Sequence, residues 1–386
     1  MTQSSRLFGG LAMAALLAAA PAAFAQAPAG APPAGAAARP MPPPRPASPV
    51  VAADRTVTFR IRAPDAKAVT MRGEFLGQGK TLALAKGDDG VWTGVSEPVP
   101  GGAYRYTFNV DGVTTLDASN TATSAERLNV QSLLFVPGVA LEANDAKTPH
   151  GTVSVVYYPS SFGGGQRRMH VYTPPGYDSG KGTFPVLYLI HGGGDSDNGW
   201  PTVGRAGFIL DNLIATGKAK PMLVVMPDGN AGPAGQVMTG DPANEPFVAD
   251  MTKSVIPYIE TNYRVVKSAD GRALAGLSMG GIQTMNVGFA NLDTFHSLGV
   301  FSSGFFPADE KVFGEKMGAQ LDAAPKKLKV FYMAWGDTDI AKPQAENNVK
   351  LFKAHGLDPI VEVTDRGHEW YNWRRYLISF APRLFR

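Results

Sequence analysis

Ala273-Leu274-Ala275-Gly276-Leu277-Ser278-Met279-Gly280 is the stretch that decides the fold of this chain. Residues 276–280 fit the G-x-S-x-G pattern of a nucleophile elbow, and they follow a short apolar strand candidate at 273–275. In such an elbow the serine sits on a strained strand-to-helix turn, and small flanking residues let neighbouring backbone pass close by. Since glycine-rich turns are common, the pentapeptide alone does not separate a reactive serine from an ordinary turn.

The residues around the elbow predict an α/β domain at 150–386. Buried strands without polar alternation are expected at 184–190, 222–226 and 328–335, with helical stretches between them. The helix that leaves the elbow is expected at 279–290. This pattern favours a mostly parallel central sheet.

A nucleophilic serine requires a base, an acid that orients the base, and donors for the oxyanion. In α/β hydrolases the order along the chain is Ser, then Asp or Glu, then His. Here Ser278 is followed by Asp337 and Asp339, just past one apolar strand, and then by His368 in a glycine-containing loop. Sequence spacing does not decide between the two aspartates. Asp365 comes from the loop of His368 itself and is expected to support that loop or to face water.

A second glycine motif, His191-Gly192-Gly193-Gly194, directly follows the strand expected at 184–190. It matches the HGGG-type loop that supplies oxyanion donors in α/β hydrolases. We therefore expect the backbone N–H groups of Met279 and Gly193 to form the oxyanion hole. His191 itself is expected to be structural.

Residues beside these motifs are candidates for binding substrate. Gly192 and Gly194 flank the expected donor, and Trp200 and Trp370 belong to a group of aromatic residues near the motif loops. Such rings could line an apolar or sugar-stacking cleft, or they could pack helices, and we favour packing for Trp373. No motif predicts a cofactor or a metal site: the segment from Asp195 begins like a calcium loop but lacks its bidentate glutamate.

Composition and the N-terminal residues indicate an exported globular protein. The chain has 386 residues, 44% of them hydrophobic, and a net charge of +3 without a long basic run, so nothing predicts nucleic-acid binding. Residues 1–25 have the features of a signal peptide, and we expect no membrane anchor after its cleavage. Residues 26–50 are rich in Ala, Pro and Gly and are expected to form a disordered linker. The chain has no cysteine, and nothing in it indicates an oligomeric state.

A small all-β module is expected at 51–138. Val57, Phe59 and Ile61 alternate with polar residues, and the segment 104–110 alternates again before the turn signal Asp111-Gly112. Short strands with frequent turns are typical of a β-sandwich.

Several stretches of the catalytic domain are similar to one family. These are Val171–Tyr177, Pro185–Gly194, Gly276–Gly281 and Gly367–Trp370. Together they resemble the esterase D-like hydrolases of carbohydrate esterase family 1, which include feruloyl and acetyl xylan esterases. The first domain is similar to the immunoglobulin-like module, related to family 48 carbohydrate-binding modules, that often precedes such domains.

The resemblance implies an α/β-hydrolase fold and an exported serine esterase that removes acyl groups from plant polysaccharide. It places the nucleophile at Ser278 and the base at His368, and its G-x-x-D pattern favours Asp339 over Asp337 as the acid. The implied partner is an acylated polysaccharide or oligosaccharide. Two alternatives stay open: a siderophore esterase, and a catalytically silent glycan-binding protein. For the β-sandwich we favour a scaffold over a glycan-binding role, because Trp92 is its only tryptophan.

Overall fold

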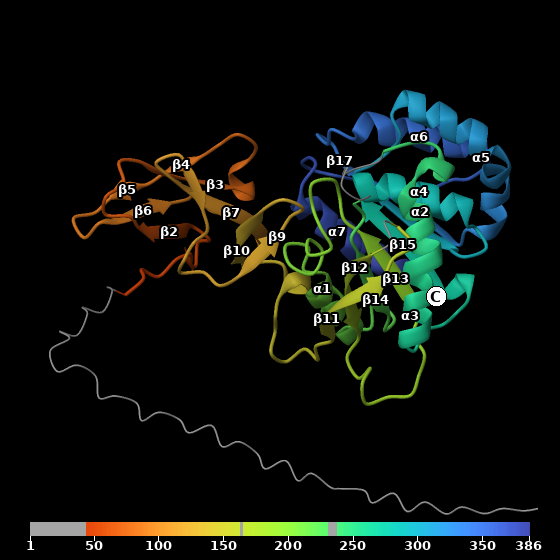
Figure 1. Ribbon diagram of the computed structural model, residues 1–386, viewed down its shortest axis with the longest axis horizontal. Helices are drawn as coiled ribbons and strands as arrows, with labels where there is room; N and C mark the ends of the chain where they lie inside the picture. Colours follow the sequence, from red (N-terminus) through yellow and green to blue (C-terminus); the bar gives the residue numbers. More distant parts are fainter. Residues whose placement is uncertain (1–43, 163–164, 231–237) are drawn as a thin grey trace, which may run out of the picture. The chain divides into compact units, whose positions relative to one another are not determined.

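The computed structural model describes residues 44–162, 165–230 and 238–386 (Figure 1). The expected signal peptide and most of the expected linker lie outside these residues. By internal contacts the chain divides into two units, 1–44 and 45–386, and the second holds all of the structure described below.

The N-terminal part of the second unit is an immunoglobulin-like sandwich of two antiparallel sheets. One sheet has the order β1-β2-β6-β5, and the other has the order β4-β3-β7-β10-β9 with β8 paired to β7. The strands are β1 (Val50–Val51), β2 (Val57–Arg62), β3 (Val69–Gly73), β4 (Leu82–Ala83), β5 (Ala85–Lys86), β6 (Val91–Val95), β7 (Gly102–Val110), β8 (Val113–Thr115), β9 (Thr123–Ala125) and β10 (Val130–Val136).

The sandwich core follows the alternation seen in the sequence. Val57 and Phe59 of β2 and Tyr106 and Phe108 of β7 are fully buried in one apolar cluster. Asp111 and Gly112 both have positive φ and join β7 to β8, as a two-residue hairpin turn requires. Trp92 also lies in this core, so its ring is no open platform for a sugar.

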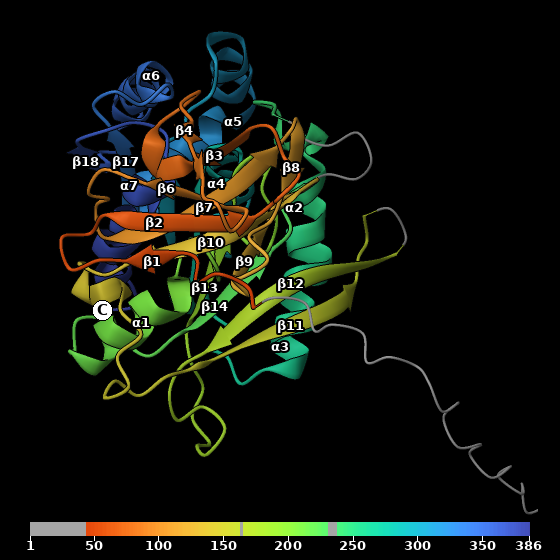
Figure 2. The same ribbon diagram turned by 90° about the vertical axis from the view of Figure 1, so that its left-hand side faces the viewer.

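The remaining strands form one eight-stranded sheet in the order β11-β12-β14-β13-β15-β16-β17-β18. Strands β14, β13 and β15 to β18 run parallel, whereas β11 and β12 form an antiparallel hairpin at one edge (Figure 2). Their bounds are β11 (Thr152–Pro159), β12 (Gln166–Thr173), β13 (Val186–Ile190), β14 (Leu223–Pro227), β15 (Arg272–Leu277), β16 (Ser297–Phe301), β17 (Val330–Gly336) and β18 (Ile360–Thr364). This is the α/β-hydrolase fold that the sequence predicted.

Helices cover both faces of the central part of this sheet, which explains why every residue of β13, β14 and β16 is buried. The helices are α1 (Ala206–Ala215), α2 (Pro246–Asp250), α3 (Ile256–Asn262), α4 (Met279–Ala290), α5 (Pro307–Lys327), α6 (Lys342–Ala354) and α7 (Trp370–Phe380), with a π-helical turn at Met251–Val255 between α2 and α3.

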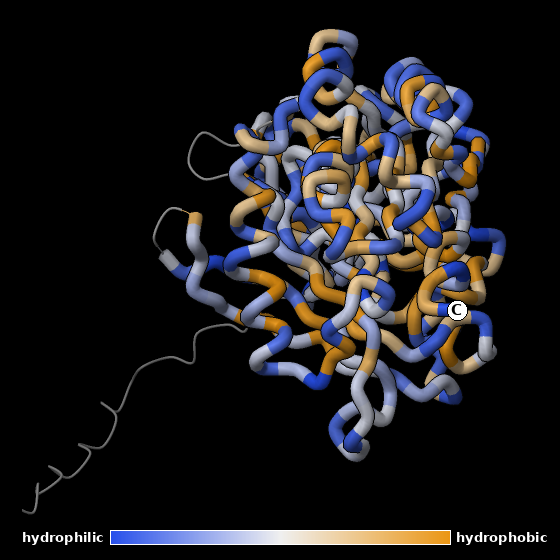
Figure 3. The backbone as a smooth tube through the Cα atoms, turned by 90° about the vertical axis from the view of Figure 1, so that its right-hand side faces the viewer, coloured by the Kyte–Doolittle hydropathy of each residue, from blue (hydrophilic) through white to orange (hydrophobic). Residues whose placement is uncertain are grey.

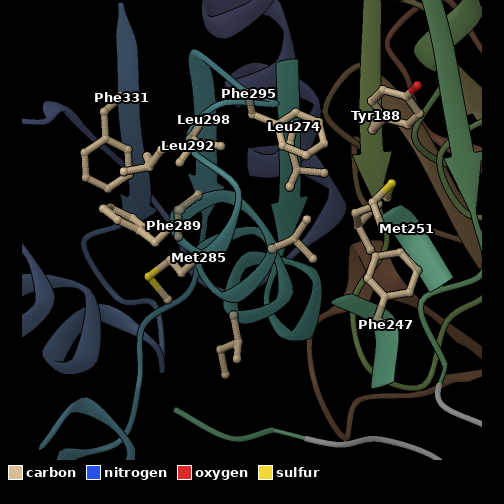
Figure 4. Packing of buried hydrophobic residues seen from close by; sticks show 14 of the residues in the cluster. Tyr188, Phe247, Met251, Leu274, Met285, Phe289, Leu292, Phe295, Leu298 and Phe331 are labelled. Atoms are coloured by element: carbon tan, nitrogen blue, oxygen red, sulfur yellow. The ribbon is translucent and has the colours of Figure 1, made fainter. Parts of the chain in front are cut away.

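Successive residues of each strand point to opposite faces. In β13, Tyr188 and Ile190 enter the core under α2 to α6, whereas Leu187 and Leu189 enter the core under α1 and α7. Figure 4 shows the first of these cores, where Leu298 of the sheet lies close to Phe289 of α4 and Leu274 belongs to the same cluster. Coloured by hydropathy, the chain shows its hydrophobic stretches gathered in the sheet at the centre (Figure 3).

Candidate active site

The elbow lies between β15 and α4, as the sequence predicted. Ser278 is half-buried and has φ 52° and ψ −118°, a strained conformation for a residue with a side chain. A Cβ on Gly276 would overlap the carbonyl oxygen of Gly280, and a Cβ on Gly280 would lie 2.5 Å from the carbonyl oxygen of His191. Both glycines are therefore needed because backbone passes directly against them.

Two serines behind the elbow were not found from the sequence. The Ser303 hydroxyl donates a 2.6 Å hydrogen bond to the carbonyl oxygen of Ser278, and Ser303 is buried. Ser302 is fully buried with φ 46°, and its N–H donates to the carbonyl oxygen of Ala334. These contacts hold the elbow against the ends of β16 and β17. Serines in a loop after a strand carry no sequence signal for this role.

The structure brings Asp339, not Asp337, to His368. Oδ1 of Asp339 accepts a 2.9 Å hydrogen bond from Nδ1 of His368 and a 2.8 Å hydrogen bond from the N–H of Ala341. The Asp339 side chain is fully buried, whereas Asp337 is exposed. Burial alone would raise the pKa of Asp339, but the hydrogen bond and charge of His368, together with weaker contributions that include the N–H of Ala341, hold this pKa below 3.8.

His368 is held so that its second ring nitrogen remains for proton transfer. A carboxylate only accepts hydrogen bonds, so the bond from Nδ1 to Asp339 places the proton on Nδ1. The imidazole packs edge-on against the ring of Trp373 at 5.1 Å between centroids. Among the residues that the structure describes, no hydrogen bond joins the Ser278 hydroxyl to Nε2. Such a bond is often long in a free enzyme and tightens when substrate binds.

The glycine loop passes directly against the nucleophile. Gly192 is buried, and a Cβ there would lie 2.5 Å from Cδ1 of Leu277 and 3.3 Å from Cβ of Ser278. Gly193 and Gly194 are exposed, and Gly194 has φ 79°. Met279 is the first residue of α4, where a backbone N–H has no partner inside the helix and can bind an anion. The expected donors thus come from the two elements that flank Ser278.

His191 is a structural residue, as expected. It is 1% exposed, and its Nε2 accepts a 2.9 Å hydrogen bond from the N–H of Gly229 while Nδ1 lies 2.8 Å from the carbonyl oxygen of Gly192. This ring ties the glycine loop to the segment that follows β14.

The prediction that Trp200 and Trp370 contact substrate is contradicted by their burial. Trp200 is 1% and Trp370 is 4% exposed, and the two rings meet edge-on at 5.1 Å. Trp200 also donates from Nε1 to the carbonyl oxygen of Ile190, the residue before the glycine loop. Both rings face inward because they fill the space under the catalytic loops. Trp373 packs as expected, and its ring also supports His368.

Neither a metal centre nor a membrane span is found in the described parts of the chain. No group of three or more His, Cys, Asp or Glu residues there is arranged to hold a metal ion. No helix among these residues is long and apolar enough to cross a membrane.

Comparisons with known proteins match the two parts of the chain to two families. Residues 160–384 match the family described as "Putative esterase", and residues 47–124 match "Carbohydrate-binding module 48 (Isoamylase N-terminal domain)". Over 352 residues, 88% of this chain, the sequence is 32% identical to an endo-1,4-beta-xylanase/feruloyl esterase of Xylanibacter ruminicola, of which it covers 46%. Over 114 residues it is 37% identical to an esterase of Mycobacterium tuberculosis, of which it covers 24%. The chain thus spans less than half the length of these curated relatives.

Solved structures show the same fold at lower identity. The feruloyl esterase module of Clostridium thermocellum, solved with sinapinate, is 22% identical with a TM-score of 0.55, over 64% of this chain and 92% of that one. The enterobactin esterase of Shigella flexneri is 17% identical with a TM-score of 0.57, over 85% of this chain and 92% of that one.

Proposed function

Because the chain belongs to the esterase family that its residues 160–384 match, we propose that it is a serine carboxylic-ester hydrolase that removes acyl groups from xylan-type polysaccharide. The observation that carries the proposal is the hydrogen bond between Asp339 and His368. It joins two residues 29 positions apart, in the chain order that a Ser-Asp-His hydrolase requires, on loops that follow the same sheet as the elbow.

The proposed mechanism forms an acyl-enzyme. Ser278 attacks the ester carbonyl while Nε2 of His368 takes its proton, and Asp339 stabilises the imidazolium that results. The N–H groups of Met279 and Gly193 stabilise the oxyanion of the tetrahedral intermediate. His368 then gives its proton to the departing alcohol and activates a water molecule that releases the acid.

The proposed acyl groups are feruloyl or acetyl. The feruloyl group is supported by the xylanase/feruloyl esterase relative, which is aligned with 88% of this chain. Gly192 and Gly194 are proposed to line the site, because they flank the expected donor and add no side chain to the space above Ser278. Ile340, which follows the catalytic acid and is 77% exposed, offers an apolar surface beside the site. An aromatic acyl group could bury part of this side chain.

The proposal includes export to the periplasm or the exterior by the signal peptide expected at 1–25, since polymeric xylan lies outside the cell. A siderophore esterase is the second candidate. It is supported by the enterobactin esterase likeness, which spans both the sandwich and the catalytic domain. A multiply charged siderophore would need a basic cleft, whereas neutral acylated xylan would not.

A Ser278→Ala variant tests the mechanism. It should lose about 10⁶-fold in turnover of a nitrophenyl ester, because the base and acid have no nucleophile to activate. The wild-type enzyme should react covalently with a fluorophosphonate at Ser278. A folded Ser278→Ala variant with near-normal activity would refute the mechanism, and an unlabelled wild-type chain would favour a silent glycan-binding protein.

A substrate panel tests the specificity. Wild-type enzyme is given methyl ferulate, acetylated xylan and enterochelin, and the released acid or alcohol is measured for each. Release from either of the first two, with no release from enterochelin, supports the proposal. Preferred cleavage of enterochelin would replace it with the second candidate.

A further inference from the structure

Strand β7 of the sandwich is buried on both of its faces. Tyr104 and Tyr106 point into the sandwich core, and Ala103 and Arg105 alternate with them on the opposite face. Ala103 belongs to the apolar cluster that also contains α7 of the catalytic domain. Arg105 is 2% exposed. Since arginine is almost never fully buried without partners, its partners indicate what this face of the strand does.

Arg105 binds the residue that ends the glycine loop. Its Nη2 and Nη1 donate to Oδ1 and Oδ2 of Asp195 at 2.9 and 3.0 Å, and its Nε donates to the hydroxyl of Ser124 at 2.9 Å. Asp195 directly follows Gly194 and is 6% exposed. A bidentate pair of this kind fixes orientation as well as distance. The sandwich therefore constrains the carboxylate next to the expected oxyanion donors.

Backbone groups of the sandwich hold the same loop. The N–H of Arg127 donates to the carbonyl oxygen of Gly194 at 3.0 Å, and the N–H of Ala125 donates to Oδ1 of Asn198 at 2.8 Å. The hydroxyl of Ser196 donates back to the carbonyl oxygen of Ala125 at 3.1 Å. Gly194 has a positive φ and no Cβ, so the loop has little stiffness of its own and depends on such contacts.

The helix after the base is held by the same strand. Arg374 of α7 is fully buried, and its Nη1 donates to the carbonyl oxygens of Ala103 at 3.0 Å and of Val203 at 3.2 Å. The guanidinium of Arg105 lies 5.7 Å from the ring centroid of Trp370, the first residue of α7. Strand β7 thus contacts both the loop that carries Gly193, one of the two expected oxyanion donors, and the helix that follows His368.

We propose that Arg105 is a positioning residue for ester hydrolysis: through Asp195 it fixes the glycine loop so that the N–H of Gly193 faces the oxyanion formed at Ser278. The N-terminal sandwich is then a working part of the active site. The inference rests on the proposed function. Oxyanion donors act only within about 2.7–3.1 Å of the developing charge, and a shift of about 1 Å can cost about 100-fold in rate.

The test compares three full-chain variants. Arg105→Met removes the guanidinium and its charge, Arg105→Lys keeps the positive charge but cannot form the bidentate pair with Asp195, and Arg168→Met is the control. Arg168, on β12 of the catalytic domain, makes a similar bidentate pair with Asp197, two residues further along the same loop, although its side chain is 40% exposed. The assay measures kcat and KM for nitrophenyl acetate, the affinity for a phenylboronic acid, and thermal unfolding.

Arg105→Met should lower kcat about 100-fold and change KM less than about 3-fold, because the donor acts on the transition state and not on bound substrate. Affinity for the boronic acid, whose tetrahedral adduct places an oxygen in the oxyanion hole, should fall in parallel. Arg105→Lys should recover part of kcat, and Arg168→Met should stay within about 5-fold of wild type. If Arg105→Met does not fold, Asp195→Asn should show the same selective loss of kcat.

Three results would overturn the inference. They are a folded Arg105→Met variant with kcat within about 3-fold of wild type, a loss that appears in KM alone, and an equal loss in Arg168→Met. A structural salt bridge would lower only the unfolding temperature. Wild-type enzyme without activity on any ester would overturn the proposed function itself, whereas an active wild type with an unimpaired Arg105→Met variant overturns only the role of Arg105.

Discussion

The pair Asp339→Asn and Asp337→Asn tests the assignment of the catalytic acid most directly. Both substitutions remove one negative charge and keep the side-chain shape, at positions two residues apart after β17. Only Asp339 bonds to His368, with 2.9 Å between Oδ1 and Nδ1, and only Asp339 is buried. The two variants should therefore differ widely in activity.

The expected loss follows from the charge that Asp339 supplies. When His368 takes the serine proton, an imidazolium forms beside a carboxylate that is already ionised. Two unit charges about 4 Å apart attract by roughly 4 kcal/mol at an effective dielectric constant of about 20. Since about 1.4 kcal/mol is a factor of ten in rate, Asp339→Asn should lower kcat about 10³-fold. Asp337→Asn should change kcat less than about 3-fold.

The assay is steady-state hydrolysis of nitrophenyl acetate at pH 8, with the circular dichroism spectrum and unfolding temperature of each variant as the control for folding. If Asp339→Asn keeps more than a tenth of the wild-type kcat, or if Asp337→Asn loses more than Asp339→Asn, the assignment is refuted.

Two further predictions concern stability. Gly276→Ala should destabilise the fold by on the order of 3 kcal/mol in urea unfolding, because its Cβ would overlap the carbonyl oxygen of Gly280. Gly318→Ala should instead stabilise the fold by up to about 1 kcal/mol, because Gly318 lies inside α5 and its new Cβ would meet no atom within 4 Å apart from its neighbours and the backbone of the helix itself. Equal effects of the two substitutions would contradict the packing argument. Burial raises the pKa of Glu245 from 4.5 to about 7, so the folded chain binds more protons than the unfolded chain between these values. The free energy of unfolding should therefore fall as pH rises through this window, by up to about 3 kcal/mol from this group, and the fall should be smaller in Glu245→Gln. Urea unfolding of both proteins at pH 5 and pH 8 measures the difference. An equal fall in the two proteins would show that Glu245 is not responsible.

The elbow and the glycine loop could be predicted because their function depends on local geometry. A serine in the strained turn needs glycines at fixed positions, and those positions are visible in the sequence. The choice between Asp337 and Asp339 could not be made from spacing, because both follow the same strand and only packing decides which one turns inward. The family resemblance favoured Asp339, and the hydrogen bond to His368 agrees with it.

The predicted substrate contacts of Trp200 and Trp370, and the role of Arg105, depend on contacts between distant segments that the sequence does not show. Trp200 and Trp370 stand near the motif loops in sequence, but sequence does not say whether a ring faces the cleft or the core. Arg105 lies on the polar face of an alternating strand, and the side chain of such a residue is expected to be exposed to solvent. It is buried because the catalytic domain packs against that face of β7. The sequence pattern of residues 102–110 does not predict that another domain packs there.

The bonds between the sandwich and the catalytic domain limit how this protein could be recombined. A fusion that replaced the sandwich would leave Asp195 without its arginine and Arg374 without the carbonyl oxygen of Ala103. A buried charge that loses its partner costs roughly 3–5 kcal/mol, which is a large part of the stability of a typical domain. In gene shuffling or enzyme engineering, the transferable unit is therefore 45–386, with the sandwich and the hydrolase inherited together.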